Sequence, residues 1–323
     1  MATITRISLS SVVVAGVVLA IVWQWDSIGP TLQRVDPLMM TWLLILQLAT
    51  IVASAVIWFA LLRKLGDPHA LARIILIYFA GQFVEAVTPA AKLGGEAARY
   101  MLLRARSPLS DGQIAASIMV SKYFSLLPFV VLNALVLVYA LWYGSLEPIW
   151  LFAFALLVVG LSVVIVGIHW PSTQPASDAA VRRSAWHRLL ASLRDAALNS
   201  RALLRGSLRH WLMGLATLIW LLYPVKIYLV ARMLDLPVDW LTTVVITYAT
   251  YLISMVPLTP GGVGTFEGSM TLLWTLFGLE PASGLALALL ARTITYWMPL
   301  LISGLATVVL LQSGWPVWRQ RVG

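Results

Sequence analysis

Residues 88–96 read TPAAKLGGE and residues 259–267 read TPGGVGTFE, and each stretch follows a run of apolar residues. Thr-Pro and a final Glu stand at the same positions in both stretches. Proline ends an incoming helix because it lacks an N–H and clashes with the preceding turn, whereas glycine allows a tight reversal. Glu96 and Glu267 then fall in the first turn of an outgoing helix, where the helix dipole favours negative charge. We predict a helical hairpin at each stretch, with turn residues Pro89, Gly94, Gly95, Pro260, Gly261, Gly262 and Gly264.

The composition of the chain places both hairpins in a membrane. Of its 323 residues, 60% are apolar and only 11% are charged, which leaves too little polar surface to cover a soluble globule of this size. A helix needs about 20 apolar residues to cross about 30 Å of hydrocarbon. Such runs occupy residues 8–25, 39–62, 113–142, 149–169, 211–232 and 284–311. We therefore predict an all-α polytopic membrane protein with about six spans plus two re-entrant hairpins, at residues 74–96 and 241–279.

Basic residues gather at the borders of the apolar runs, where they set the orientation in the membrane. The net charge of +9 is concentrated in residues 63–73, in Arg99, Arg104 and Arg106, at the C-terminus and above all in the loop 170–210. Loops on the cytoplasmic side carry an excess of Lys and Arg. We therefore expect a multi-pass protein of the cell inner membrane with both termini in the cytoplasm, and no nucleic-acid partner.

The flanking charges also predict the side from which each hairpin enters. Basic residues stand on both sides of 74–96, so this hairpin enters from the cytoplasm and returns there. Asp239 and Glu280 flank 241–279, so the second hairpin enters from the opposite side. Irregular backbone at membrane depth must be buried in protein or line a wet cavity, because lipid cannot satisfy its N–H and C=O groups. The two hairpins are therefore expected to point at each other.

The span after each hairpin repeats a further pattern. A cation follows each glutamate by 25 or 26 residues, and a proline follows each cation: Lys122 with Pro128, and Arg292 with Pro299. The recurrence of Thr-Pro, glycine, glutamate, cation and proline in one order indicates an inverted repeat. It divides the chain into an N-terminal membrane half, 1–169, a basic cytoplasmic amphipathic loop, 170–210, and a C-terminal membrane half, 211–323.

Several ionisable residues lie within otherwise apolar segments and are the candidate translocation residues. They are Glu85, Glu96, Lys122, Lys226, Glu267 and Arg292. An ionisable side chain at this depth costs about 2.5–3.5 kcal/mol, so each should face a cavity or an opposite charge. Structural roles also fit: the glutamates can stabilise half-helix starts, the cations can be their partners, and Lys226 can extend outward to the membrane surface. Glu85 has no counterpart in the second hairpin, which favours a structural role for it.

Several classes of site are excluded by what the sequence lacks. It has no cysteine, so disulfides and thiolate metal sites are ruled out. Its four histidines have no ligand spacing, and no P-loop, dinucleotide-binding or nucleophile-elbow motif occurs. We therefore expect no metal, no cofactor and no catalytic residue.

Two segments of the chain resemble a known family. VTPAAKLGGEAARYMLLR at 87–104 and PLTPGGVGTFEGSMTLL at 257–273 are similar to the signature segments of the lysylphosphatidylglycerol synthase transmembrane-domain family. The resemblance implies a flippase-like membrane module, which in the synthase carries the aminoacylated lipid across the bilayer and in relatives is linked to glycolipids, hopanoids or polyprenyl-linked sugars. Because the chain ends shortly after its last span, we expect neither the soluble aminoacyl-transfer domain nor the synthase activity.

These observations favour a lipid translocator, in which a polar head group crosses through a cavity between the repeats while its tail stays in the bilayer. Lys122, Arg292 and Lys226 would neutralise a phosphate, and N–H groups near Gly95 and Gly264 would add donors. The partners are then membrane lipids: an anionic phospholipid, a glycolipid or a polyprenyl-linked lipid. A homo-oligomer is also compatible with the sequence.

Two other functions stay open. A membrane-embedded lipid or glycosyl transferase would use Glu85 or Glu267 as a base, but it needs a donor pocket, for which no motif is found. A non-transporting scaffold for lipid-synthesis enzymes would not need paired charges inside the membrane. The energy source of a translocator also stays open. The lipid can move down its own concentration gradient, or its movement can be coupled to protons, with Glu96 or Glu267 as proton carriers.

The loop 170–210 generates a first prediction. Trp186, Leu189 and Leu193 follow helical spacing with arginines between them, which is typical of an amphipathic helix on a membrane surface. A peptide of residues 180–210 is expected to become helical on anionic vesicles and to stay unstructured on neutral ones, because each basic residue near the surface contributes about 1 kcal/mol. Circular dichroism measures the difference, and a peptide that stays unstructured on anionic vesicles contradicts the amphipathic helix.

Overall fold

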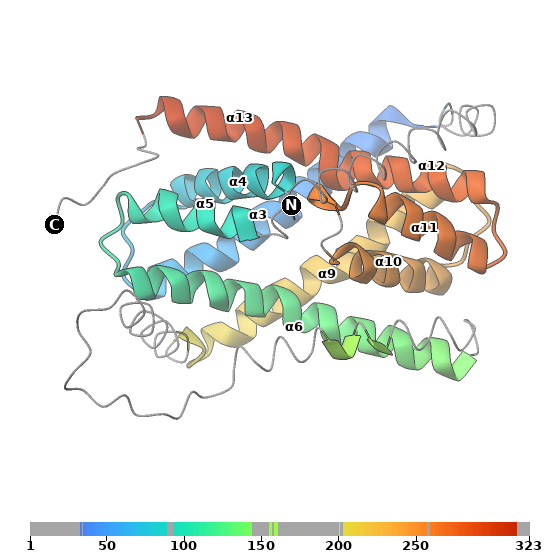
Figure 1. Ribbon diagram of the computed structural model, residues 1–323, viewed down its shortest axis with the longest axis horizontal. Coiled ribbons are helices and arrows are strands. Elements are labelled where there is room, and N and C mark those ends of the chain that lie inside the picture. The colour runs from blue at the N-terminus through green and yellow to red at the C-terminus, as the bar shows by residue number, and fades with distance from the viewer. Residues whose placement is uncertain are drawn as a thin grey trace, which may run out of the picture.

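The computed structural model describes residues 35–88, 93–143, 203–256 and 259–314, together with the positions 33, 155–156, 158–160 and 200. All regular structure in these residues is helical (Figure 1). Four helical stretches are long and apolar enough to cross a membrane: Pro37–Lys64, Asp111–Trp142, Leu208–Met233 and Pro281–Gln312. They contain four of the predicted spans, and the prediction of a helical membrane protein is confirmed. The predicted spans 8–25 and 149–169 lie outside the described residues, apart from five positions of the second.

Three of the long stretches each form a single α-helix. α3 (Pro37–Lys64) begins after Asp36, whose carboxylate accepts a hydrogen bond from the N–H of Leu38 at 2.9 Å. This cap satisfies one of the N–H groups that a helix start leaves without a partner. α6 (Asp111–Tyr143) and α9 (Leu208–Met233) are the other two, and they cover the predicted spans 113–142 and 211–232.

The fourth long stretch changes its helical form near its middle. α12 (Pro281–Arg292) passes through a π-helical turn, η2 (Thr293–Trp297), into α13 (Met298–Gln312). Pro299 has no N–H to donate to the carbonyl four residues before it, so the regular hydrogen-bond pattern is interrupted at this position. π-Turns inside longer helices are frequent at functional sites.

The first hairpin consists of α4 (Leu71–Val87) and α5 (Leu93–Arg104), which pack against each other. Pro89 lies outside the described residues. The prediction that Gly94 and Gly95 form the turn is wrong, since both lie in the first turn of α5 and neither has a positive φ. A Cβ atom on Gly95 would lie 2.7 Å from the carbonyl oxygen of Gly81 in α4. These glycines therefore allow the two helices to approach closely.

The second hairpin consists of α10 (Trp240–Ser254), the 3-10 turn η1 (Pro260–Gly262) and α11 (Thr265–Leu276). Here the glycines lie in the turn itself. Gly261, Gly262 and Gly264 have φ angles of 59°, 69° and 84°, a region of backbone conformation that side chains with a Cβ rarely adopt.

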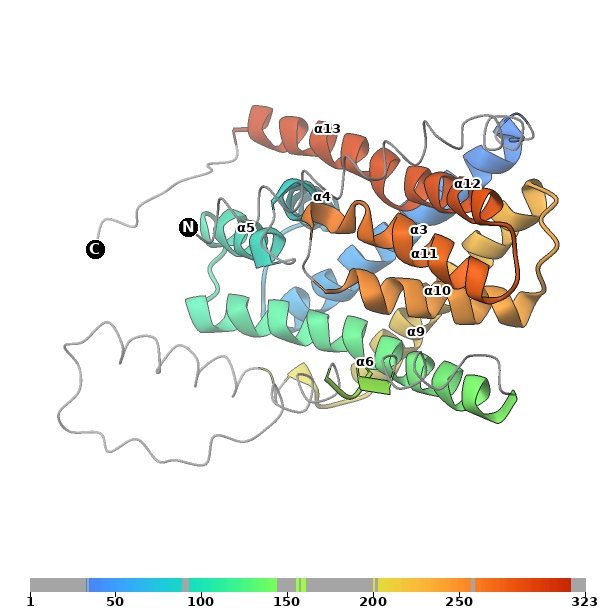
Figure 2. The ribbon, with the colours of Figure 1, turned by 45° about the vertical axis from the view of Figure 1, so that its right-hand side comes forward.

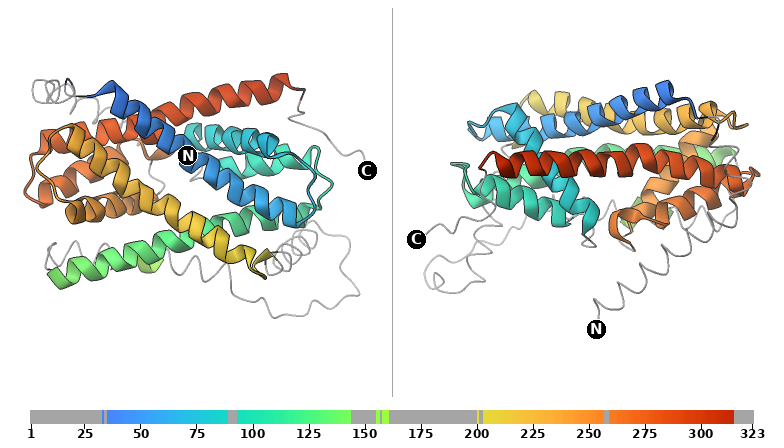
Figure 3. Two further views of the ribbon diagram at one scale, coloured as in Figure 1. Left: turned by 180° about the vertical axis from the view of Figure 1, so that it is seen from behind. Right: turned by 90° about the horizontal axis from the view of Figure 1, so that it is seen from above.

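The C-terminal end of α4 and the turn η1 meet near the middle of the molecule (Figures 1 and 2). η1 contacts α4, and the hydroxyl of Tyr296 in η2 donates a hydrogen bond to the carbonyl of Ala86 in α4 at 3.0 Å. α3 and α9 run side by side on one face of the bundle (Figure 3, left). Each hairpin is braced by the long helix that follows the other one, because α13 packs on α4 and α6 packs on α10.

The packing of the hairpins predicts how their ends are labelled from the two sides of a membrane. Exposed Ala70 and Pro108 flank the first hairpin, and exposed Pro237 and Glu280 flank the second. A membrane-impermeant maleimide is expected to label single cysteines at the first pair from one side and at the second pair from the other. The chain itself has no cysteine, so there is no background. Labelling of the two members of one pair from opposite sides would show that its helices cross the membrane separately.

Candidate functional site

The breaks of the two hairpins border a polar cavity of about 280 Å³. Its walls come from both hairpins, from the long helices α3, α6 and α9, and from the stretch α12–η2–α13. Of the predicted translocation residues, Glu85, Lys122 and Arg292 line the cavity, and a further cation, Arg99, lines it with them. The other three predicted residues lie behind this lining.

Glu96, Arg99 and Lys122 form the first ion cluster. Glu96 lies in the first turn of α5, as predicted, and its Oε1 is 2.6 Å from Lys122 Nζ and 3.0 Å from an Arg99 Nη. The Arg99 guanidinium also lies over the ring of Tyr78, 3.8 Å from its centroid. Glu85, on α4, interacts electrostatically with both cations. One carboxylate thus holds two cations at the wall of the cavity.

The interpretation of Arg99 as a residue that borders a loop is wrong. Its side chain is 3% exposed and belongs to the interior of the bundle. The reason is that α5 continues to Arg104, which pairs with Asp111 at 2.9 Å beside the loop. The first hairpin is therefore longer than the predicted 74–96. A signal for Arg99 exists in the sequence, because Glu96 precedes it by three residues and this spacing places both on one helix face.

Glu267 and Arg292 form the second ion cluster, and both side chains are buried. Arg292 Nε lies 3.2 Å from Glu267 Oε1, and its Nη2 donates to the carbonyl of Gly261 at 2.7 Å. The guanidinium also lies over the ring of Tyr296, 4.1 Å from its centroid. One cation therefore connects α11, the turn η1 and the π-turn η2.

The N-terminus of α11 is capped by its own carboxylate. Glu267 Oε2 accepts a hydrogen bond from the N–H of Gly264 at 2.6 Å, which satisfies one of the free donors of the helix start. The N–H of Gly264 is therefore not free for a phosphate, whereas phosphate binding by N–H groups near Gly95 and Gly264 stays a prediction. Gly95 is buried against α4 and does not line the cavity. The side-chain cations that line the cavity are the other candidates for binding an anion.

The two clusters share one arrangement. In each, a glutamate in the first turn of the returning helix pairs with a cation on the next long helix, and this cation lines the cavity while the glutamate does not. The prolines that follow the two cations lie in α6 and in α13. The glutamates therefore act as counter-charges, and the cations face the space.

Lys226 lies inside the bundle, and the alternative that it extends to the membrane surface is wrong. Its side chain is buried, with 1% of its surface exposed. Its Nζ donates to Gln47 Oε1 at 2.5 Å, lies 3.5 Å from Thr50 Oγ1, and is 4.0 Å from the ring centroid of Tyr223. These three neighbours line the cavity, so Lys226 lies directly behind its wall.

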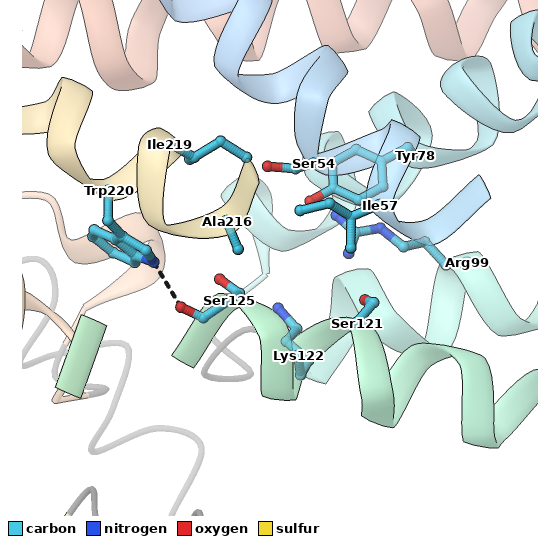
Figure 4. A pocket seen from close by; sticks show the side chains of 10 residues that line it. All are labelled: Ser54, Ile57, Tyr78, Arg99, Ser121, Lys122, Ser125, Ala216, Ile219 and Trp220. Carbon is cyan, nitrogen blue, oxygen red and sulfur yellow. Dashed lines mark hydrogen bonds between the residues drawn. The ribbon is translucent and has the colours of Figure 1, made fainter. Parts of the chain in front are cut away.

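A smaller chamber of about 40 Å³ lies beside the cavity, between α3, α6 and α9 (Figure 4). Lys122 and Arg99 line both spaces, and Figure 4 shows them pointing toward one another from α6 and α5. Trp220 forms part of the shared wall, where its Nε1 donates to the carbonyl of Ser125 at 2.6 Å. The two cations of the first cluster therefore lie at the junction of the two spaces.

Uncharged polar residues complete the lining, and the sequence reasoning missed them. They include Gln47, Gln82, Tyr223, Tyr251 and Tyr296. An amide inside a long apolar span, such as Gln47 in α3, is a usable signal, because a polar group at this depth needs a partner. The tyrosines carry no such signal, since tyrosine is common at membrane borders.

The second ion cluster generates a stability prediction. Glu267→Gln is expected to lower the free energy of unfolding by about 1.5–3 kcal/mol, because the amide still caps α11 but leaves the Arg292 charge without its counter-charge. Glu280→Gln is the matched control, since Glu280 is exposed and its side chain makes no capping bond at the start of α12. Thermal unfolding in detergent measures both variants. Equal melting temperatures would show that the buried pair does not stabilise the fold.

Comparison with known proteins shows the family of the chain. The family described as lysylphosphatidylglycerol synthase TM region matches residues 7–303. A UPF0104 membrane protein of Methanothermobacter thermautotrophicus is 23% identical over 294 residues, which cover 84% of this chain and 86% of that protein. UPF0104 membrane proteins of Pyrococcus horikoshii and Methanocaldococcus jannaschii are also 23% identical, over 89% and 88% of this chain and 92% and 88% of their own lengths. The chain therefore belongs to the lysylphosphatidylglycerol synthase TM region family.

Proposed function

We propose that this protein is a lipid translocator, which moves a phosphate-containing head group between the two leaflets while the lipid tail stays in the bilayer. The observation that carries the proposal is the cavity: three cations line a space of about 280 Å³ inside a bundle of apolar helices. Membership of a family named after the membrane region of a lipid-modifying synthase supports a lipid-related role.

The charges of the cavity suit an anionic head group. A guanidinium binds phosphate through two parallel N–H···O bonds, and an ammonium binds it as a point charge. Arg99 and Lys122 lie together at one part of the cavity, and Arg292 lines another.

The size of the cavity suits a head group rather than a whole lipid. Small-molecule sites typically enclose about 300–1,000 Å³, so a space of about 280 Å³ accommodates one polar head group but no acyl chains. The amides of Gln47 and Gln82 and the hydroxyl of Tyr251 can bind glycerol or sugar hydroxyls. These features support an anionic phospholipid, a glycolipid or a polyprenyl-linked lipid that carries a phosphate.

Alternating access follows from the inferred topology. We infer an inverted repeat of residues 1–169 and 211–323, with six spans and two re-entrant hairpins, in the inner membrane and with cytoplasmic termini. The recurring glutamate–cation pairs and the meeting of the two breaks support this arrangement. Movement of the hairpins against the long helices would then open the cavity to each side in turn.

The geometry favours a translocator over a transferase. Glu267, one of the two candidate bases, is engaged by the Gly264 N–H and by Arg292, and it does not line the cavity. The other, Glu85, is the one carboxylate in the cavity lining within the described residues, and two cations neighbour it. The proposed translocator therefore involves no catalytic residue and no cofactor. A scaffold, in turn, would not need a cation-lined cavity.

Neutralising one cavity cation tests the proposed function. Lys122→Gln is the sharpest variant, because Glu96 keeps Arg99 as a partner and the fold should survive. In liposomes, the rate at which a fluorescent phosphatidylglycerol moves between leaflets is expected to fall about tenfold or more, which corresponds to about 1.4 kcal/mol of lost stabilisation. Quenching of outer-leaflet fluorescence by dithionite measures this rate.

Two controls make this experiment decisive. Arg232→Gln removes an exposed cation in the last turn of α9 and should leave the rate unchanged. A fluorescent glycolipid without phosphate should move more slowly than phosphatidylglycerol through the parent protein. Normal lipid movement by a Lys122→Gln protein that folds poorly would show that the cation is structural, and would favour the scaffold.

A further inference from the structure

One cation in the bundle is held differently from the others. Arg99, Lys122 and Arg292 each contact a carboxylate. Lys226 is 1% exposed, and the contacts described for it are to neutral groups: an amide, a hydroxyl and an aromatic ring. A buried ammonium that lacks a counter-charge is costly.

The helices that pack against α9 bring no carboxylate to this lysine. They are α3, α6, α10 and α12. The charged or titratable side chains that they place in the interior are Lys122, Tyr123 and Tyr139 on α6, Tyr248 and Tyr251 on α10, and Arg292 on α12, whereas α3 places none there. Within these helices and α9, the one acidic residue is Asp111, at the first position of α6, where it pairs with Arg104.

Among the residues that the structure describes, the charges around the cavity are balanced without Lys226. Three of their carboxylates lie in or behind the cavity wall, and so do three of their cations other than Lys226: Glu85, Glu96 and Glu267 with Arg99, Lys122 and Arg292. A protonated Lys226 therefore adds one uncompensated positive charge to an empty cavity. A single phosphodiester anion in the cavity would neutralise that charge.

The neighbours of Lys226 suit both of its protonation states. The Gln47 amide accepts a hydrogen bond from an ammonium through its oxygen, and after rotation it donates to a neutral amine through its nitrogen. The Thr50 hydroxyl donates to the carbonyl of Gln47 at 2.7 Å, so it presents an acceptor to Lys226, to which an ammonium and a neutral amine can both donate. The Tyr223 ring attracts the ammonium form of Lys226 and is also compatible with the neutral amine. A carboxylate in their place would favour the charged form alone.

We propose that Lys226 is a proton-binding site coupled to occupancy of the cavity by a phosphodiester head group. Its Nζ takes one proton from water when the anion enters and returns it when the anion leaves, and no other bond changes. One layer of side chains separates Lys226 from the cavity, because the residues that contact it also line the cavity: Gln47, Thr50 and Tyr223. The charge of Lys226 and the charge of the bound phosphodiester therefore act on each other across this layer. Coulomb attraction is strong in such surroundings because little water screens it. This inference rests on the proposed function and adds proton coupling to it.

Proton uptake on lipid binding tests the inference in the purified full chain. Short-chain phosphatidylglycerol is titrated at mildly alkaline pH in two buffers of different ionisation enthalpy, and the difference in calorimetric heat gives the protons taken up. We expect uptake of about one proton per lipid, with an affinity that falls about tenfold per pH unit over the same range. The uptake should disappear at a pH low enough to protonate Lys226 in the empty protein.

Variants at this position separate proton binding from a structural role. Lys226→Met cannot bind a proton, and Lys226→Arg stays charged throughout, so both should bind the lipid without net proton uptake and with little pH dependence. Lys64→Met is the control: Lys64 is exposed at the end of α3, outside the cavity, and its removal should leave the proton uptake unchanged.

The possible outcomes distinguish the two proposals. Lipid binding by the parent protein without proton uptake, or uptake that persists in Lys226→Met, overturns the proton site and leaves the translocator intact. Absence of both lipid binding and lipid movement in the parent protein overturns the translocator, and the proton site with it. If Lys226→Met does not fold, Lys226→Arg and the pH dependence of the parent protein decide the question.

Discussion

A single buried arginine connects three places where regular helix structure is interrupted. Arg292 contacts Glu267 at the start of α11, the carbonyl of Gly261 in η1 and the ring of Tyr296 in the π-turn. Interrupted helices leave polar backbone groups that lipid cannot satisfy. The guanidinium has five donors in a fixed fork, which suits it to such a junction. One charge therefore connects the second hairpin with the π-turn η2 of the last long stretch, and Glu267 compensates that charge.

The first hairpin solves the same problem with different residues. Glu96 compensates two cations instead of one, and it does so from the same position, the first turn of the returning helix. In both clusters the carboxylate stays behind the cavity wall. This arrangement reduces the cost of burying the cations while leaving them oriented toward the space, and it separates the groups that stabilise the fold from those that can meet a ligand.

The sequence predicted the long helices and the places of the hairpins. In hydrocarbon the backbone N–H and C=O groups must form hydrogen bonds within helices, and proline or glycine marks the places where a helix is interrupted. It predicted the pairs of Glu96 with Lys122 and of Glu267 with Arg292 from their recurrence. It did not predict the close packing around Gly95, because that is a tertiary contact, and a glycine in a turn and a glycine between two helices look the same in sequence. The spans 8–25 and 149–169, the loop 170–210 and the inverted repeat remain predictions.

The way the two halves interlock restricts how the cavity can open. α13 lies on the first hairpin and α6 on the second, so each hairpin is braced by a long helix from the other half. The halves cannot separate as two independent blocks without losing this packing. The tip of the first hairpin, in contrast, is joined to the π-turn η2 by a neutral hydrogen bond from Tyr296 to the carbonyl of Ala86, which contributes about 0.5–1.5 kcal/mol. The returning helix of each hairpin is held to the next long helix by an ion pair, whereas this polar contact between the first hairpin and η2 is weaker. In the proposed translocator, small displacements of the hairpin tips against the long helices would therefore be the least costly way to expose the cations to one side of the membrane.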